Sequence, residues 1–417
     1  MKTIVDLHIH SRYSRACSKD LTLPLIGKAC ERKGIDVVGT GDFTHPAWCA
    51  SIKELLREET PGIFVLRDGS SKTKFMLTTE LACIYTHRDA VRRLHLCVFA
   101  PSLAAVEKLN TALEARGCNI RSDGRPILGV SAKALLRMIL DIDSAFMMVP
   151  AHAWTPWFAV FGSKSGYDTL EECFEELTPH IRAIETGLSS DPLMNRRLSA
   201  LDSITLISNS DAHSLEKLGR EANVFDLPKV TYAAITDAIA TGDRARFLYT
   251  IEFFPEEGKY HFDGHRDCGV SLHPRDSARE GFRCPTCKKP LTIGVMNRVE
   301  ALADRTEDAV PMERFIGCKK IIPLDAIIAD TLGVGTASKR VRALYDQLIT
   351  GAGSEFFVLL DAPAEAIARA SSPAVAEAIA RVRAGNITIV PGYDGVYGRV
   401  KIFDDEERTR AAQQPLL

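Results

Sequence analysis

Histidine, aspartate and glutamate side chains recur at the ends of short apolar runs in the first half of the chain. The run IVDLHIH carries a His-x-His pair, and the run ITLISNSDAH closes with Asp-x-His. Side chains alternate along a strand, so both imidazoles of a His-x-His pair lie on one face. Mixed imidazole and carboxylate ligands suit zinc, manganese and iron. We therefore expect a polynuclear metal site built from His8, His10, Asp42, His45, Glu80, His95, His152, Asp211 and His213.

A second set of metal-capable residues lies farther along the chain. Cys284 and Cys287 are separated by two residues, and His265 and Cys268 have the same separation. The pattern H-x2-C-x15-C-x2-C is typical of a structural Cys3His zinc site. His261 and His273 stay open as alternatives for the histidine ligand. A redox-active Cys-x-x-Cys is disfavoured, because no βαβ pattern surrounds the pair.

Positive charge gathers around the cysteine pair. From Gly258 to Arg298 there are eight Lys or Arg against four Asp or Glu. Clustered basic side chains can neutralise phosphates, and aromatic side chains in loops can stack on bases. An ordinary solvated surface can have the same composition, so both interpretations stay open. The candidate DNA-binding residues are Lys288, Lys289, Arg298, Tyr393 and Tyr397.

Apolar runs alternate with helical patterns over the region that holds the first set. This alternation is typical of parallel βα units, and about 250 residues suit a closed barrel of the TIM type. In such a barrel the C-terminal ends of the strands converge on one face, where active sites form. The expected strands are 4–10, 37–42, 74–85, 92–101, 145–154, 181–187, 204–211 and 246–254, and the expected helices are 23–34, 103–117, 131–143 and 232–242.

Composition bounds the rest of the molecule. Hydrophobic residues make up 46% and charged residues 25% of the 417 residues, which excludes a disordered or fibrous protein. No apolar run could span a membrane and the N-terminus lacks a secretory pattern, so we expect a cytoplasmic protein whose 11 cysteines stay reduced. We expect a metal-binding barrel at 1–252, a zinc-binding segment at 253–300 and a mixed α/β unit at 301–417, with a strand at 356–361 and a strand pair within 386–403.

The first set of motifs resembles the PHP domain, named for polymerases and histidinol phosphatases. The resemblance implies a distorted (β/α)7 barrel, followed here by the small zinc-binding domain and the C-terminal mixed α/β unit. It also implies a metal centre, holding zinc or else magnesium or manganese, in which Glu80 bridges two ions. Such centres hydrolyse phosphoesters, because clustered metals activate a water and stabilise the attacking and leaving oxygens. Catalysis would then depend on His8, His10, Glu80, Asp211 and His213. The segments that carry the resemblance are DLHIH (6–10), TGD (40–42), TTE (78–80), LHL (94–96), PAH (150–152) and SDAH (210–213).

Two positions depart from the PHP pattern. The usual H-x-H-S-x-x-S-D-G reads HIHSRYSRA, so Arg15 stands where an aspartate ligand is expected. The usual T-D-H is replaced by TGDFTH, so Asp42 aligns with the family histidine and His45 follows after a shift. The choice between Asp42 and His45 as the ligand therefore stays open, as does the number of metals.

The whole chain resembles the endonuclease Q family, in which the same three parts follow in this order. The segment HSRYSRA belongs to this resemblance, so Arg15 is a feature of the subgroup. The resemblance implies a nucleoid-associated DNA repair endonuclease that acts on double- or single-stranded DNA. It would cut on the 5′ side of a deaminated nucleotide, carrying uracil, hypoxanthine or xanthine, or of an abasic site. The matching segments are 6–20, 40–46, 185–192, 207–214, 253–269, 284–295 and 391–403.

Two other functions remain open from the sequence. The first is a small-molecule phosphatase of the histidinol-phosphate type, which needs the barrel. This function does not explain the zinc site, the basic segment or the C-terminal unit. A DNA-binding adaptor with an inactive barrel would explain the departures at Arg15 and Asp42 but not the otherwise complete ligand set. Partner proteins in repair or replication cannot be identified from the residues.

Overall fold

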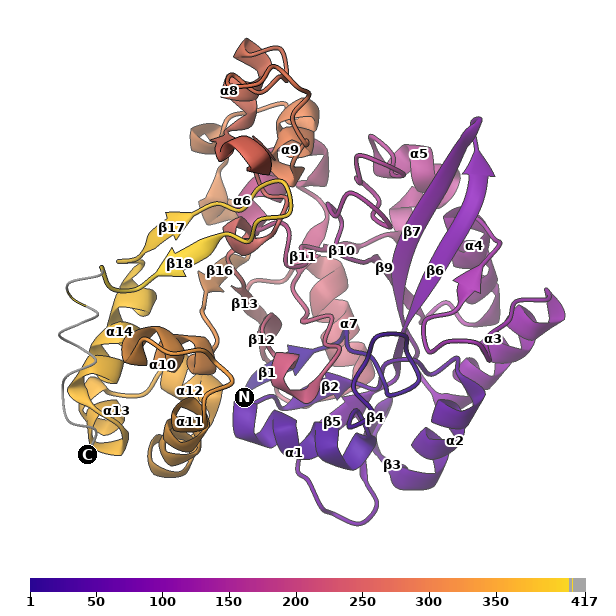
Figure 1. Ribbon diagram of the computed structural model, residues 1–417. Helices are drawn as coiled ribbons and strands as arrows, with labels where there is room; N and C mark the ends of the chain where they lie inside the picture. Colours follow the sequence, from indigo (N-terminus) through magenta and orange to yellow (C-terminus); the bar gives the residue numbers. More distant parts are fainter. Residues whose placement is uncertain (405–406, 408–417) are drawn as a thin grey trace. The chain divides into compact units, whose positions relative to one another are not determined.

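The computed structural model describes residues 1–404 and 407 (Figure 1). Its internal contacts divide the chain into two compact units. The first unit comprises Met1–Glu31, Ile35–Glu252 and Val295–Lys319. The second comprises Arg32–Gly34, Phe253–Gly294 and the described residues from Lys320 onward. The expected division into three parts stays a prediction, and the end of its last part lies outside the described residues.

The larger sheet of the first unit has eight strands in the order β16-β13-β12-β1-β2-β5-β4-β3. The pairs β1–β2 and β2–β5 are parallel, as expected of βα units. On the other side of β1, strands β12 and β13 instead pair antiparallel, so the prediction of parallel strands is wrong there. The bounds are β1 Lys2–Asp6, β2 Val37–Gly39, β3 Leu56–Thr60, β4 Ile63–Leu66, β5 Lys74–Met76, β12 Ala222–Asp226, β13 Phe247–Glu252 and β16 Gly317–Lys320.

A second sheet, in the order β8-β6-β7-β9, contains a long hairpin where two parallel strands were expected. Strands β6 and β7 are antiparallel and joined only by Arg88 and Asp89. Both residues have positive φ, 50° and 59°, as a two-residue type I′ turn requires. The remaining pair, β10–β11, is parallel. The bounds are β6 Thr78–His87, β7 Ala90–Phe99, β8 Ile127–Leu128, β9 Met147–Pro150, β10 Ala183–Glu185 and β11 Thr205–Ile207.

These sheets surround one apolar core, which includes Val5, Phe99, Val149, Ile207 and Phe247. Single backbone hydrogen bonds connect them, from His10 N to Ala212 O and from Ala153 N to Glu185 O. Within the described residues the strands stay in separate sheets, and no closed ring of paired strands is observed. The fold is therefore a mixed α/β fold whose sheets share a common core.

Capping side chains fix where several helices of the first unit begin. Ser102, Ser131 and Thr231 each accept a hydrogen bond from the backbone N–H three residues later, which satisfies a donor at the helix start. The expected helices after these residues are confirmed. The bounds are α1 Leu23–Lys33, α2 Pro46–Leu55, α3 Leu103–Ala115, α4 Ala132–Ile142, α5 Leu170–Phe174, α6 Pro192–Arg196, α7 Tyr232–Thr241 and α9 Val295–Leu302.

The second unit combines a short Cys/His-containing segment with a group of helices. The expected strand at 356–361 is wrong, because these residues form helix α12. Arg383 donates to the carbonyls of Val358 and Leu359 and so satisfies groups that the end of a helix leaves free. The expected final strand pair is confirmed as β17–β18. The bounds are β14 Asp263–His265, β15 Val270–Leu272, α8 Pro274–Arg279, α10 Leu324–Leu332, α11 Lys339–Ala352, α12 Glu355–Leu360, α13 Ala364–Ala370, α14 Pro373–Ala384, β17 Thr388–Val390 and β18 Arg399–Lys401. In the described part of the chain, every helix is too short or too polar to cross a membrane.

Candidate metal centre

Four of the predicted residues lie together at the strand ends of the first unit. His8 and His10 follow β1, Glu80 lies in β6 and Asp211 follows β11, and one ligand atom of each lies within 4.8 Å of the others. His10 Nε2 is 3.1 Å from Asp211 Oδ1 and 3.2 Å from Glu80 Oε2. His8 Nε2 is 3.5 Å from Glu80 Oε2. The strand ends thus converge on one group of two imidazoles and two carboxylates.

Glu80 also belongs to a second group, with His95 and His152. Its Oε1 atom lies 2.7 Å from His95 Nδ1 and 3.2 Å from His152 Nε2. Its Oε2 atom faces His8 and His10 in the first group. One buried carboxylate therefore serves two sets of imidazoles, the arrangement expected of a carboxylate that bridges two ions.

Glu185, at the end of β10, was not identified from the sequence. Its carboxylate lies 3.0 Å from His8 Nδ1 and accepts hydrogen bonds from Asn209 Nδ2 and His152 N. A carboxylate on the second ring nitrogen fixes the tautomer and orientation of a metal-binding histidine. In the run IRAIETG the carboxylate directly follows the apolar residues, and this was the available signal.

Asp42 contacts His10 as Glu185 contacts His8, through the Nδ1 atom of the ring. Its Oδ1 atom is 3.1 Å from His10 Nδ1, and its Oδ2 atom accepts hydrogen bonds from Ser11 and Ser14. The structure places Asp42 on the far nitrogen of His10 and not in either group around Glu80. Thr155 Oγ1 lies in the same way 3.1 Å from His152 Nδ1.

The remaining predicted residues lie at the edge of these groups. His45 stacks on Tyr13, with ring centroids 4.4 Å apart, and is not part of either group. The ring of His213 is 4.6 Å from that of His10, and its Nδ1 atom is 2.8 Å from the Asp211 carbonyl oxygen. Arg15, the departure from the PHP pattern, is exposed.

Burial and neighbouring charges shift the pKa of Glu80 and that of His95. Burial opposes ionisation of Glu80, but His95, Arg125 and His8 hold its pKa well below the ordinary value. Burial lowers the pKa of His95 to about 4, against the attraction of Glu80. An ionised carboxylate and a neutral imidazole are the forms that ligate metals.

Arg125 is a further residue that the sequence did not indicate. It follows α3 in a loop, and its Nη1 atom donates to Glu80 Oε2 at 2.9 Å. The preceding residue must be glycine, because a Cβ atom on Gly124 would lie 2.3 Å from Asp42 Oδ2. Nothing in the spacing of the loop residues distinguishes this arginine from an ordinary surface residue.

A cavity of about 290 Å³ opens beside the two groups. Gly187 lets its wall approach closely, because a Cβ atom there would lie 2.5 Å from His152 Cβ. Trp157 is 50% exposed, whereas Trp154 is buried and donates from Nε1 to Asn195. The lining residues are His95, Arg125, His152, Thr155, Trp157, Phe158, Gly187, Leu188, Ser189, Asp211 and His213.

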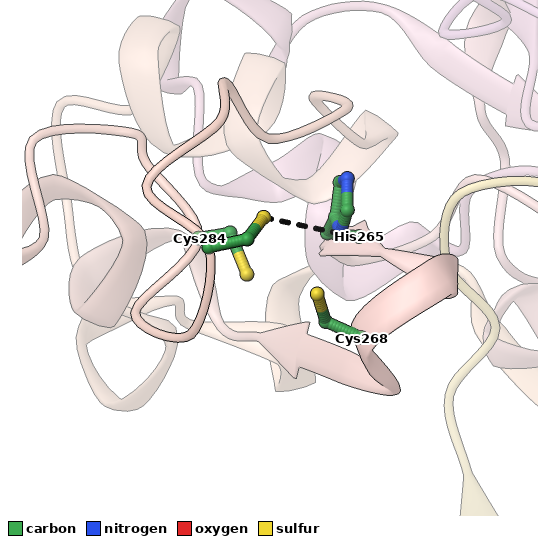
Figure 2. Close-up of side chains that lie close together, drawn as sticks. His265, Cys268 and Cys284 are labelled. Carbon is green, nitrogen blue, oxygen red and sulfur yellow. Dashed lines mark hydrogen bonds between the residues drawn. The ribbon is translucent and has the colours of Figure 1, made fainter.

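The predicted zinc ligands of the second unit also lie together. Ligand atoms of His265, Cys268, Cys284 and Cys287 lie within 4.8 Å of one another, and Figure 2 shows His265, Cys268 and Cys284 around a common space. Of the alternatives, His273 caps α8 by accepting from Arg275 N. His261 stacks on Phe262 and is outside the group. The second unit therefore contains a Cys3His group suited to a metal ion.

The candidate DNA-binding residues differ in how they are placed. Lys288, Lys289 and Tyr397 are exposed, and Lys259 Nζ lies 4.5 Å from the centroid of the Tyr397 ring. Tyr393 packs against Gly264, where a Cβ atom would lie 2.3 Å from its ring. Arg298 donates to the carbonyls of Phe161 and Tyr167 and to Asp168, so its guanidinium is engaged within the first unit.

We expect that replacing Glu185 by glutamine weakens metal binding about 10–100-fold, the usual effect of losing a partner of a metal-binding histidine. The cause would be a misoriented His8 ring, since Glu185 contacts its Nδ1 atom. Competition with a chromophoric chelator measures the affinity, and Glu176→Gln, at a 56% exposed glutamate, is the control. Equal affinity in both variants would contradict the role of Glu185.

Two family models and two curated proteins are similar to parts of this chain or to nearly all of it. A family model described as PHP-associated matches residues 195–243, and one described as MJ0043 C-terminal domain matches 323–386, which covers helices α10 to α14. An uncharacterised protein of Bacillus subtilis, YqxK, is 30% identical over 413 residues, covering 96% of this chain and 99% of that one. The uncharacterised protein MJ0043 of Methanocaldococcus jannaschii is 30% identical over 272 residues, 63% of this chain and 33% of its own length.

Two solved structures are similar over the full chain. The lesion-specific endonuclease PfuEndoQ of Pyrococcus furiosus is 33% identical, with a TM-score of 0.86 and coverage of 100% of this chain and 98% of that one. Endonuclease Q in complex with a 27-mer duplex that has an abasic lesion at the active site is also 33% identical, with a TM-score of 0.84 and coverage of 99% and 98%. With this identity over nearly the whole length, the chain belongs to the endonuclease Q family.

Proposed function

We propose that this chain is a metal-dependent DNA repair endonuclease that hydrolyses the phosphodiester bond on the 5′ side of a damaged nucleotide. The damage is a deaminated base (uracil, hypoxanthine or xanthine) or an abasic site. The observation that carries the proposal is the sharing of Glu80 between two groups of imidazoles beside a cavity. Membership of the endonuclease Q family supplies the substrate class.

The residues around Glu80 fit metal ions. His8 Nε2 is buried and faces Glu80 and Asp211 at 3.5 and 3.6 Å, and among the described residues it has no hydrogen-bond partner. Two ligand atoms that are each about 2.1 Å from an ion in tetrahedral geometry lie about 3.4 Å apart. The observed separations match this value. Zinc suits these ligands, and magnesium or manganese would suit the carboxylates.

When bound, the metals would supply an activated water and neutralise the charge that develops on the phosphate. The side chains of the protein hold this centre in place. Glu185, Asp42 and Thr155 fix the rings of His8, His10 and His152 through the nitrogens that point away from it. Asp211 and His213 line the cavity, where they would be close to a bound phosphate.

The cavity suits the nucleotide on the 3′ side of the cut. Extruding a nucleotide from the duplex costs a few kcal/mol, and less for a mispaired or missing base. Trp157 and Phe158 offer apolar surface against which the extruded nucleotide can pack. The lower cost of extrusion therefore favours damaged nucleotides, even without a contact that recognises the base.

The second unit has a supporting role in the proposal. His265, Cys268, Cys284 and Cys287 hold a structural zinc, and Lys288, Lys289 and Tyr397 contact DNA. We also infer that the sheets of the first unit act as one interrupted (β/α)7 barrel. The protein would then work on chromosomal DNA in the cytoplasm.

The proposal is tested with end-labelled duplexes that carry one deoxyuridine, deoxyinosine, deoxyxanthosine or abasic site, beside an undamaged control. Each is incubated with the full-length protein and added zinc, magnesium or manganese. We expect a single nick immediately 5′ of the damage, none in the control duplex, and none after chelation.

Two other results would redirect the assignment. Release of phosphate from small esters without any nick would favour the phosphatase. Damage-dependent binding without cleavage under any metal would favour the DNA-binding adaptor. Either outcome would overturn the endonuclease proposal.

A further inference from the structure

We propose that Arg125 binds the phosphate that is cut, through the guanidinium nitrogens that it does not use on Glu80. This inference rests on the proposed function, because it names the residue that receives the scissile phosphate. Nothing in the family motifs points to this residue, which lies in a loop between α3 and β8.

The guanidinium of Arg125 faces two ways. Its Nη1 atom donates to Glu80 Oε2 at 2.9 Å, and its side chain is 25% exposed and lines the cavity. Within the described residues, Nη1 is the guanidinium atom of Arg125 for which a hydrogen-bond partner is found. The Nε and Nη2 donors therefore remain available to a ligand in the cavity.

The backbone around Arg125 is held rigidly. Its own N–H donates to Asp123 Oδ1 at 3.0 Å, and Gly124 N donates to Tyr13 O at 3.1 Å. Pro126 O accepts from Ala82 N in β6, two residues beyond Glu80. Because the loop is anchored on both sides, the side chain is positioned before any ligand arrives, which is what stabilisation of a developing charge requires.

An arginine is suited to this task in a way that a lysine is not. The planar guanidinium can hold a carboxylate with one nitrogen and a phosphate oxygen with others, whereas an ammonium is a point charge. The other titratable side chains that line the cavity are the Asp211 carboxylate and three imidazoles. Arg125 is the one guanidinium group that lines it among the described residues, so it offsets the negative charge of Asp211 and Glu80 as the phosphate approaches.

The test combines an Arg125 variant with a duplex whose phosphate at the cleavage site has lost its negative charge. Arg125→Ala is compared with Arg121→Ala, which removes the same charge from the same loop at a side chain that is 70% exposed. For each protein in its metal-loaded form, the half-saturating concentration of an abasic duplex is measured under single-turnover conditions. It is compared with the inhibition constant of the same duplex carrying a methylphosphonate at the cleavage site. Metal content is measured in parallel.

We expect the methylphosphonate to bind more weakly than the natural duplex to the wild type and to Arg121→Ala. In Arg125→Ala this difference should shrink about tenfold or more, the ratio expected for loss of a hydrogen bond to a charged group, with unchanged metal content. An unchanged difference in Arg125→Ala would overturn the proposal, as would loss of metal, because Arg125 would then act only by holding Glu80. Failure of the wild type to cut any damaged duplex would refute the endonuclease instead, and in that event the dissociation constants of the two duplexes, measured by direct binding, still decide whether Arg125 senses the phosphate charge.

Discussion

Replacing Glu80 by glutamine should reduce cleavage of a damaged duplex at least about 10³-fold. Both oxygens of this carboxylate are in use, Oε1 by His95 and His152 and Oε2 by His10 and Arg125. An amide of the same shape has one weakly ligating oxygen, so two ions could not share it. Bound metals supply several kcal/mol of transition-state stabilisation, and each 1.4 kcal/mol or so corresponds to tenfold in rate.

Metal analysis and DNA binding separate this explanation from general damage to the fold. We expect Glu80→Gln to lose the metals of the first unit, to keep about one zinc ion in the second unit, and to bind damaged duplex with nearly wild-type affinity. Glu176→Gln, at an exposed glutamate that pairs with Lys133 and Arg137, should be indistinguishable from wild type in all three measurements. Cleavage by Glu80→Gln at more than a tenth of the wild-type rate would remove the metal-bridging role.

Most residues of the centre that could be predicted from sequence lie at the end of an apolar run, whereas Glu80 and His95 lie within β6 and β7. His8, His10 and Asp211 follow strands whose apolar residues enter the core, so strand order alone brings them together. Glu185 also follows an apolar run but is not part of a His-x-His or Asp-x-His motif, and it was missed. Arg125 lies in a loop whose path depends on the contacts of Gly124 and Asp123, and no local pattern encodes those contacts.

The errors in the fold have a similar cause. Strand periodicity identifies β6 and β7 but not their relative direction, which is decided by the two positive-φ residues Arg88 and Asp89. Neither is a glycine or an asparagine, so the turn gave no sequence signal. The run FFVLLD is short and apolar, and tertiary contacts from Arg383 decide that it is a helix. Sequence spacing has the same limit at Asp42. It predicted that Asp42 lies in the metal centre, but it could not distinguish a metal ligand from a hydrogen-bond partner of His10.

Replacing Cys284 by serine should remove zinc from the second unit and destabilise the segment 253–294. Cys284 is fully buried, and apart from two prolines the other buried apolar side chains of this described segment are Phe254 and Leu291. So small a core cannot hold two short strands and one helix together. In small zinc domains the metal contributes on the order of 10 kcal/mol to folding, and a serine hydroxyl does not ionise to replace the thiolate.

Loss of the zinc should also loosen the C-terminal strand pair. The turn between β17 and β18 is attached to this segment through Asp394, which accepts from Arg266 N at 2.8 Å and from Thr292 Oγ1 at 2.6 Å. Hydrogen exchange should therefore accelerate both in 259–292 and around Asp394 in Cys284→Ser, while the first unit keeps its protection. Cys118→Ser, which removes a partly buried thiol elsewhere, should leave zinc content and exchange unchanged. Normal zinc content in Cys284→Ser would refute the ligand assignment, and rapid exchange confined to 259–292 would show that the strand pair is stable without the metal.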